Sequence, residues 1–144
     1  MQLANTSGSQ KIMSLGNTAQ TRGFGTTYED GYTYWSANIG DSDPLLGSKV
    51  TGEWTFIAVL YNQPAEEIRF VVNNTLYSSK GKLKKGVDVI TIGNFEGKVD
   101  ELRMYSRFLT PIELEQLYGA PMLFKDSDLL VKERVNYRAK QKQD

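Results

Sequence analysis

Short apolar runs separated by turn residues dominate the pattern along this chain. Seven of these runs have strand-like length, many of them alternate apolar and polar positions, and Gly, Asn, Asp or Pro lies between most of them. We therefore predict an all-β fold, an antiparallel β-sandwich. The predicted strands cover residues 11–15, 26–28, 32–39, 54–61, 68–73, 87–92 and 98–105.

Two neighbouring runs predict a hairpin in the middle of the chain. Residues 54–61 are apolar at both odd and even positions, which is typical of a central strand covered on both faces. Residues 68–73 follow after a polar connection and predict the antiparallel partner strand. Asn73 and Asn74 favour a tight turn, after which residues 75–78 return as a further strand.

A strand and a capped helix are predicted near residue 110. Residues 98–105 place Leu102 and Met104 on one face, as expected for a strand with one mostly apolar side. Thr110, Pro111 and Glu113 then form a Thr-x-x-Glu capping box with proline in the first turn. Gly119 is a helix-stop residue, so the helix is expected at residues 111–118.

Three segments, in this order, resemble motifs of the laminin G-like, concanavalin A-like family. They are Gly52-Glu53-Trp54-Thr55-Phe56-Ile57-Ala58-Val59, Phe70-Val71-Val72-Asn73-Asn74 and Gly97-Lys98-Val99-Asp100-Glu101-Leu102-Arg103-Met104-Tyr105 followed by Arg107-Phe108-Leu109-Thr110-Pro111. The resemblance covers about residues 8 to 118 and implies a jelly-roll sandwich. Members of this family often bind glycans or proteins through loops at one rim, and some hold Ca²⁺ there.

The chain departs from the family pattern at both ends. Family members usually have strands before the matched region, including one that lies beside a strand near the end of the domain. A trimmed sandwich, the segment 122–131 or a neighbouring chain could each account for the difference. We assign residues 1–121 to the sandwich, with N-terminal strands possibly missing, and residues 122–144 to a charged C-terminal tail or docking segment.

Composition narrows the classes of function. Seventeen basic and seventeen acidic residues balance, which disfavours nucleic acid as a partner. The absence of His and Cys removes imidazole and thiolate chemistry. The sequence has no apolar run long enough for membrane insertion and no recognisable signal peptide. We predict an extracellular, cell-surface or virion location.

Paired carboxylates are the first catalytic feature to test, because glycan-cleaving members of the family that the chain resembles use two acids that flank one bond. Asp100 with Glu101 and Glu66 with Glu67 are the adjacent pairs, but neighbours on a strand point to opposite faces. We therefore predict that the chain is not an enzyme, and rank a glycoside hydrolase-like activity third among the functions. Asp100 is expected to be structural, paired with Arg103, Arg107 or backbone amides.

Oxygen-rich residues near position 40 form the candidate metal site. Asp30, Asp41 and Asp43, with Asn38 nearby, offer the carboxylate and amide oxygens that Ca²⁺ prefers. The same Asp-Ser-Asp-Pro run is also an ordinary turn sequence. Calcium is thus the single cofactor that we consider.

A second group of residues has the chemistry of a sugar site. Glycans bind to aromatic faces together with Asn, Asp or backbone groups, and Tyr28, Asp30, Tyr32 and Asn38 supply both. Aromatic residues in strands also serve as core, so one face of residues 32–39 is expected to be buried.

These observations lead to two main functional hypotheses. The first is a non-catalytic recognition module that binds a glycan or a surface protein in carbohydrate binding or adhesion. The alternative is a structural assembly protein, such as a virion decoration, fibre or tail component, whose sandwich is completed by neighbouring subunits. Under that alternative the partner is a homo-oligomer or an assembly neighbour.

Overall fold

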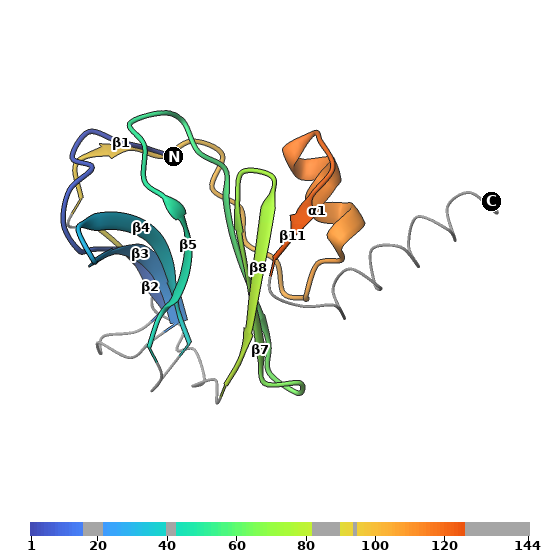
Figure 1. The fold of residues 1–144 in the computed structure, drawn as a ribbon. Coiled ribbons are helices and arrows are strands. Elements are labelled where there is room, and N and C mark those ends of the chain that lie inside the picture. The colour runs from blue at the N-terminus through green and yellow to red at the C-terminus, as the bar shows by residue number, and fades with distance from the viewer. Residues whose placement is uncertain (16–21, 40–42, 82–89, 94, 126–144) are drawn as a thin grey trace.

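The structure is a computed structural model that describes residues 1–15, 22–39, 43–81, 90–93 and 95–125. Strands make up about half of the described residues, all pair antiparallel except β11 with β8, and one short helix accompanies them, which confirms the all-β prediction (Figure 1). The elements in chain order are β1 (Gln2–Leu3), β2 (Gln10–Leu15), β3 (Arg22–Glu29), β4 (Tyr32–Asn38), β5 (Leu45–Lys49), β6 (Ile57–Asn62), β7 (Glu67–Val72), β8 (Thr75–Lys80), β9 (Ile90–Ile92), β10 (Gly97–Lys98), α1 (Pro111–Tyr118) and β11 (Leu123–Phe124).

The first layer is a five-stranded antiparallel sheet in the order β5-β4-β3-β2-β9. Two neighbouring inner strands, β2 and β3, approach closely at two glycines of β3. A Cβ atom at Gly23 or Gly25 would lie 2.0 Å from a β2 carbonyl oxygen, that of Met13 or Gln10 respectively. Glycine is therefore required at both positions.

The second layer is a four-stranded sheet in the order β11-β8-β7-β6. The predicted hairpin and the returning strand are confirmed, because β7 pairs antiparallel with β6 and with β8. The prediction that residues 54–61 form the central strand is wrong. All six residues of β7 are buried, whereas β6 begins only at Ile57 and ends the sheet in the described chain. The apolar run on both faces of β6 reflects its position between two cores rather than between two strands.

The main core lies between the two sheets. Alternate residues of β4 and β7 face each other there, with Trp35, Ala37, Ile68, Phe70 and Val72 all at most 2% exposed. The prediction that one face of residues 32–39 is buried is thereby confirmed. The Tyr61 hydroxyl joins the layers, since it accepts a hydrogen bond from the Gly23 amide at 2.7 Å and lies 3.0 Å from the Asn38 carbonyl oxygen.

A second core covers the other face of the four-stranded sheet. Leu60, Val71 and Leu76 of the sheet pack there against Leu109 and Leu114. The predicted helix is confirmed at Pro111–Tyr118, with Thr110 and Glu113 forming the capping box and Gly119 in the left-handed conformation. Met122 is completely buried and β11 pairs in parallel with β8, so the sandwich continues past residue 121. Residues 126–144 of the predicted tail lie outside the described residues.

The predicted strand at residues 98–105 is wrong. Only Gly97–Lys98 pair, with β1, and residues 99–105 form no strand and are all exposed. The expected pairing of Asp100 with Arg103 or Arg107 is also wrong, because Asp100 is exposed and those arginines pair with Glu101 and Glu113. The strand predicted at 87–92 is present at Ile90–Ile92, and residues 87–89 lie outside the described residues.

Candidate functional site

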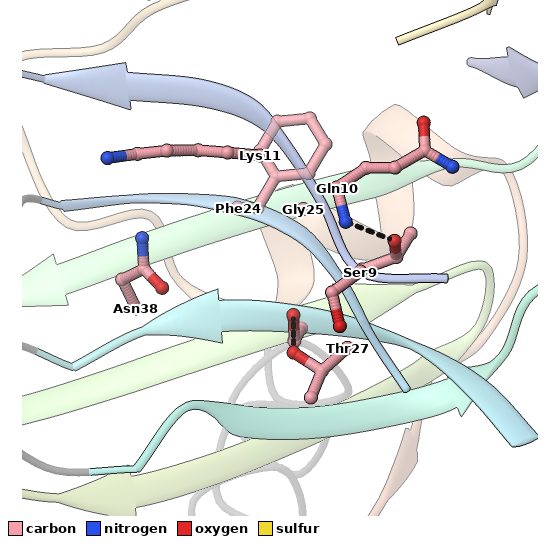
Figure 2. Close-up of a pocket in the computed structure, with 9 residues that line it drawn as sticks. Ser9, Gln10, Lys11, Phe24, Gly25, Thr27 and Asn38 are labelled. Carbon is pink, nitrogen blue, oxygen red and sulfur yellow. Dashed lines mark hydrogen bonds between the residues drawn. The ribbon is translucent and has the colours of Figure 1, made fainter. Parts of the chain in front are cut away.

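A polar groove lies on the face of the five-stranded sheet that points away from the main core. Strand alternation brings side chains of β2, β3 and β4 to this face, and the groove has a volume of about 290 Å³ (Figure 2). The residues that line it are Ser9, Gln10, Lys11, Phe24, Gly25, Thr26, Thr27, Ser36 and Asn38.

Hydrogen bonds fix part of the groove and leave part of it open. The Thr27 hydroxyl donates to the Ser36 hydroxyl at 2.8 Å, and the backbone amide of Gln10 donates to Thr26 Oγ1 at 3.0 Å. The Asn38 side-chain amide forms no hydrogen bond with the described residues, although its backbone carbonyl accepts one from Tyr61. A rigid hydroxyl pair therefore lies in the same groove as an amide that is available to a ligand.

The charge of the groove is set by one residue. Lys11 on β2 is opposite Gly25 on β3, and no carboxylate is among the described residues that line the groove. The arrangement suits a ligand rich in hydroxyl groups, with or without negative charge.

The structure separates the four residues predicted to bind a glycan. Asp30 lies in the turn between β3 and β4 with φ +49°, and Tyr28 and Tyr32 flank that turn, 58% and 53% exposed. Tyr28 is opposite Thr33, and Tyr32 is opposite Glu29, so the two rings belong to opposite faces of the sheet. Asn38 is at the other end of β4, about 20 Å away at roughly 3.3 Å per residue. Of the four, Asn38 alone lines the groove.

The acidic residues predicted to bind calcium are also apart. Asp30 precedes β4, and Asp43 follows its far end, with Asp41 outside the described residues. In the described part of the chain, no group of three acidic residues is arranged to hold a metal ion.

The carboxylates considered for catalysis have different surroundings. Glu66 is exposed, whereas Glu67 is buried and pairs with Arg69 at 3.1 Å. Glu113 is the carboxylate with the clearest shift, because its hydrogen bonds with Arg107 and with the Thr110 backbone lower its pKa to about 2. That pair is part of the helix cap rather than of the groove.

Sequence reasoning missed most of the groove. Lys11, Thr27 and Ser36 are not among the predicted site residues, because each is an ordinary strand residue whose place in the groove depends on three strands that lie side by side. One signal was present in the sequence. Gly23 and Gly25 alternate within a strand, which often marks a close approach of two backbones.

Two segments expose large hydrophobic side chains, β9 and residues 99–105. Several such side chains within one short segment often mark an interaction site. The residues are Ile90, Ile92, Val99, Leu102, Met104 and Tyr105.

Searches against protein-family models, curated proteins and solved structures each found no match. Among the described residues, no helix has the length and apolar character needed to cross a membrane.

Proposed function

We propose that this chain is a non-catalytic recognition module, a laminin G-like jelly roll that binds an oligosaccharide in the groove on its five-stranded sheet. The observation that supports this proposal is the polar lining around the Asn38 side-chain amide, which has no partner among the described residues. Sugar hydroxyls both donate and accept hydrogen bonds, so they suit an amide beside a pair of hydroxyl groups.

The neighbouring surface supports the same proposal. Tyr34 is on the groove face of β4, two positions from Ser36, and Tyr32 follows on the same face. Lys49 Nζ lies 3.6 Å from the centre of the Tyr32 ring, which orients that ring. A sugar chain that extends from Asn38 along β4 meets hydroxyl groups first and aromatic rings next.

A glycan array probed with the full chain tests this proposal. Asn38→Ala is expected to weaken binding about threefold to tenfold, the effect of one lost neutral hydrogen bond. Asn74→Ala, on the β7–β8 turn, is the matched control and is expected to bind normally. Equal glycan binding by Asn38→Ala and Asn74→Ala would show that the groove is not the binding site. Repeating the array with calcium and with a chelator tests the calcium site predicted at Asp30, Asp41 and Asp43.

The second candidate function is assembly, in which the module is a structural component completed by neighbouring subunits. The specific observation in its favour is the exposed apolar surface that includes Leu102 and Met104, 52% and 56% exposed. Light scattering on the full chain tests it. A self-associating chain is expected to become monomeric with Leu102→Ser plus Met104→Ser. Tyr28→Ser, at an exposed aromatic residue on the distant hairpin, is the control.

A further inference from the structure

The groove lies at one end of a longer row of side chains on β4. Strand alternation places Asn38, Ser36, Tyr34 and Tyr32 on the face that carries the groove, in this order toward the β3–β4 turn. Their register with β3 runs without interruption from Asn38 to Tyr32. The four side chains therefore form a straight row of about 20 Å, at roughly 3.3 Å per residue.

The register of the neighbouring strands joins the far part of this row to the groove. Thr27 lines the groove and lies directly opposite Tyr34. Lys49 of β5 lies opposite the same tyrosine on its other side. Directly opposed residues on one face have Cβ atoms about 5 Å apart, within reach of an aromatic side chain. Tyr34 therefore borders the groove, which Figure 2 shows with Asn38 and Thr27 at separate points along it.

The two halves of the row offer different contacts to a ligand. Asn38 and Ser36 supply an amide and a hydroxyl group. Tyr34 is half-buried and Tyr32 is 53% exposed, so both tyrosines present part of an aromatic ring. The hydroxyl groups of the two tyrosines form no hydrogen bond with the described residues. A ligand that lies along the row meets hydrogen-bonding groups at one end and apolar ring faces at the other.

The aromatic end of the row is held in place. Lys49 Nζ lies 3.6 Å from the centre of the Tyr32 ring, and a cation at this distance orients the ring. A ring that is already oriented loses less conformational entropy when a ligand binds. Beyond Tyr32 the two strands end at the turn formed by Asp30 and Gly31, both with positive φ. The row therefore has a preorganised aromatic end.

The shape of the row limits which sugar chains can contact all of it. Chains of the cellulose type, joined by equatorial β-linkages, are extended and expose apolar C–H groups on both faces of each ring. Chains of the starch type, joined by α-linkages, coil and leave a straight surface after the first contacts. An extended chain can hydrogen-bond to Asn38 through one unit and stack further units on Tyr34 and Tyr32.

We propose that the site binds a straight, unbranched, β-linked oligosaccharide of at least three units along β4. One unit lies at Asn38 and Ser36, the next over Tyr34 and the third over Tyr32. This proposal rests on the proposed function, because it requires glycan binding in the groove. It adds the class of ligand and two binding residues, Tyr34 and Tyr32, outside the groove lining.

Calorimetric titration of the full chain with three series of oligosaccharides tests the proposal. The probes are chains of one to six units of β-linked glucose, of β-linked N-acetylglucosamine and of α-linked glucose. In at least one β-linked series, affinity is expected to rise about tenfold or more between two and four units, as the chain reaches the tyrosines. The α-linked series is expected to show no such rise. The proposal is overturned if no β-linked series shows the rise, or if the α-linked series shows the same one.

The glycan array separates this proposal from the proposed function. If the array shows binding that Asn38→Ala weakens, but only to branched or α-linked glycans, the proposed function stands and the straight-chain ligand is excluded. If the array shows no glycan binding at all, the proposed function fails, and this proposal fails with it.

Two tyrosines provide a matched pair of variants. Tyr32 and Tyr28 flank the same turn, 53% and 58% exposed, but their rings belong to opposite faces of the sheet. Tyr32→Ala is expected to remove most of the gain in affinity of the longer chains, and Tyr28→Ala to retain it. Tyr34→Leu, which keeps an apolar side chain at a half-buried position, should lower the gain severalfold. An equal gain in the parent chain, in Tyr32→Ala and in Tyr34→Leu would contradict the proposal.

Asn38→Ala is expected to give the complementary pattern. It should weaken β-linked chains of every length that binds by the same factor of about three to ten, because the unit at Asn38 is common to all of them. A loss that occurs only with the longest chains would show that the first unit binds elsewhere, which would overturn the proposed arrangement along β4.

Discussion

Two tetrapeptides with the same Glu-apolar-Arg-apolar pattern differ completely in conformation and burial. Glu67-Ile68-Arg69-Phe70 forms β7, in which every residue is buried, and Glu101-Leu102-Arg103-Met104 is exposed and forms no strand. Both contain a Glu–Arg pair. In the first the two side chains are 3.1 Å apart and at most 11% exposed, and in the second they are 3.6 Å apart and more than half exposed.

Strand partners account for the difference. β7 has β6 on one side and β8 on the other, so its amides and carbonyls are bonded in both directions. Residues 101–104 have no partner strand in the described chain. A segment with this local pattern can form a strand, but it does so only where neighbouring strands supply hydrogen bonds and side-chain contacts.

The buried ion pair gives the largest expected contrast between the two tetrapeptides. Arg69→Leu leaves the Glu67 carboxylate buried without that partner, so the free energy of unfolding should fall by about 3 to 5 kcal/mol. Arg103→Leu should change it by less than about 1 kcal/mol, because its pair is exposed. Urea denaturation measures both. Replacing Glu67 and Arg69 together by Leu should recover part of the stability that Arg69→Leu loses. Equal losses for Arg69→Leu and Arg103→Leu would contradict the expected difference between the buried and the exposed ion pair.

The central apolar residues provide the next contrast. Ile68 is completely buried, so Ile68→Ala should lower the free energy of unfolding by about 2 to 5 kcal/mol. Leu102 is 52% exposed, so Leu102→Ala should stay within about 0.5 kcal/mol of the parent chain. Thermal unfolding followed by circular dichroism compares them. A large loss for Leu102→Ala would mean that this side chain is covered in solution.

The contrast also explains which features the sequence could predict. The β6–β7 hairpin, the β8 return and the capped helix depend on local signals, namely alternation, the Asn73-Asn74 turn and the Thr110 box, and all of them are confirmed. The central strand and the strand at 98–105 depend on neighbours distant in sequence, and both predictions are wrong. The groove depends on three strands at once, so of the predicted site residues only Asn38 lies in it.

A smaller loss of stability is expected from changes at Tyr61, whose hydroxyl joins β6 to the five-stranded sheet. Its hydroxyl accepts a hydrogen bond from the Gly23 amide, so Tyr61→Phe leaves that amide unpaired and should cost about 1 to 3 kcal/mol. Burial raises the pKa of Tyr61 to about 12, against an ordinary value near 10. The neutral form is thus favoured in the folded state. This contribution to stability is full below about pH 10 and is lost as the pH rises to about 12.

Denaturation at several alkaline pH values checks this second expectation. The parent chain should lose stability more steeply than Tyr61→Phe between about pH 10 and 12, since only the parent carries the shifted phenol. Tyr28→Phe, which removes the phenol hydroxyl of an exposed tyrosine, is the matched control variant. Parallel slopes for the parent chain and Tyr61→Phe would show that burial does not raise the pKa of Tyr61 in the folded state.

The helix cap gives the smallest expected effect and marks where the exposed segment rejoins the fold. Thr110 Oγ1 accepts a hydrogen bond from the Glu113 amide at 3.2 Å, so Thr110→Ala should cost about 1 kcal/mol. Hydrogen bonds with Arg107 and Thr110 lower the pKa of Glu113 to about 2, so its contribution is present above about pH 4.5 and fades as the pH falls toward 2. Acid denaturation should therefore begin at higher pH in Arg107→Ala than in Arg103→Ala, whose partner Glu101 lies in the unpaired segment. If Arg107→Ala and Arg103→Ala unfold at the same pH, the Arg107–Glu113 pair does not stabilise the fold. The helix cap then does not anchor the segment that leads into it.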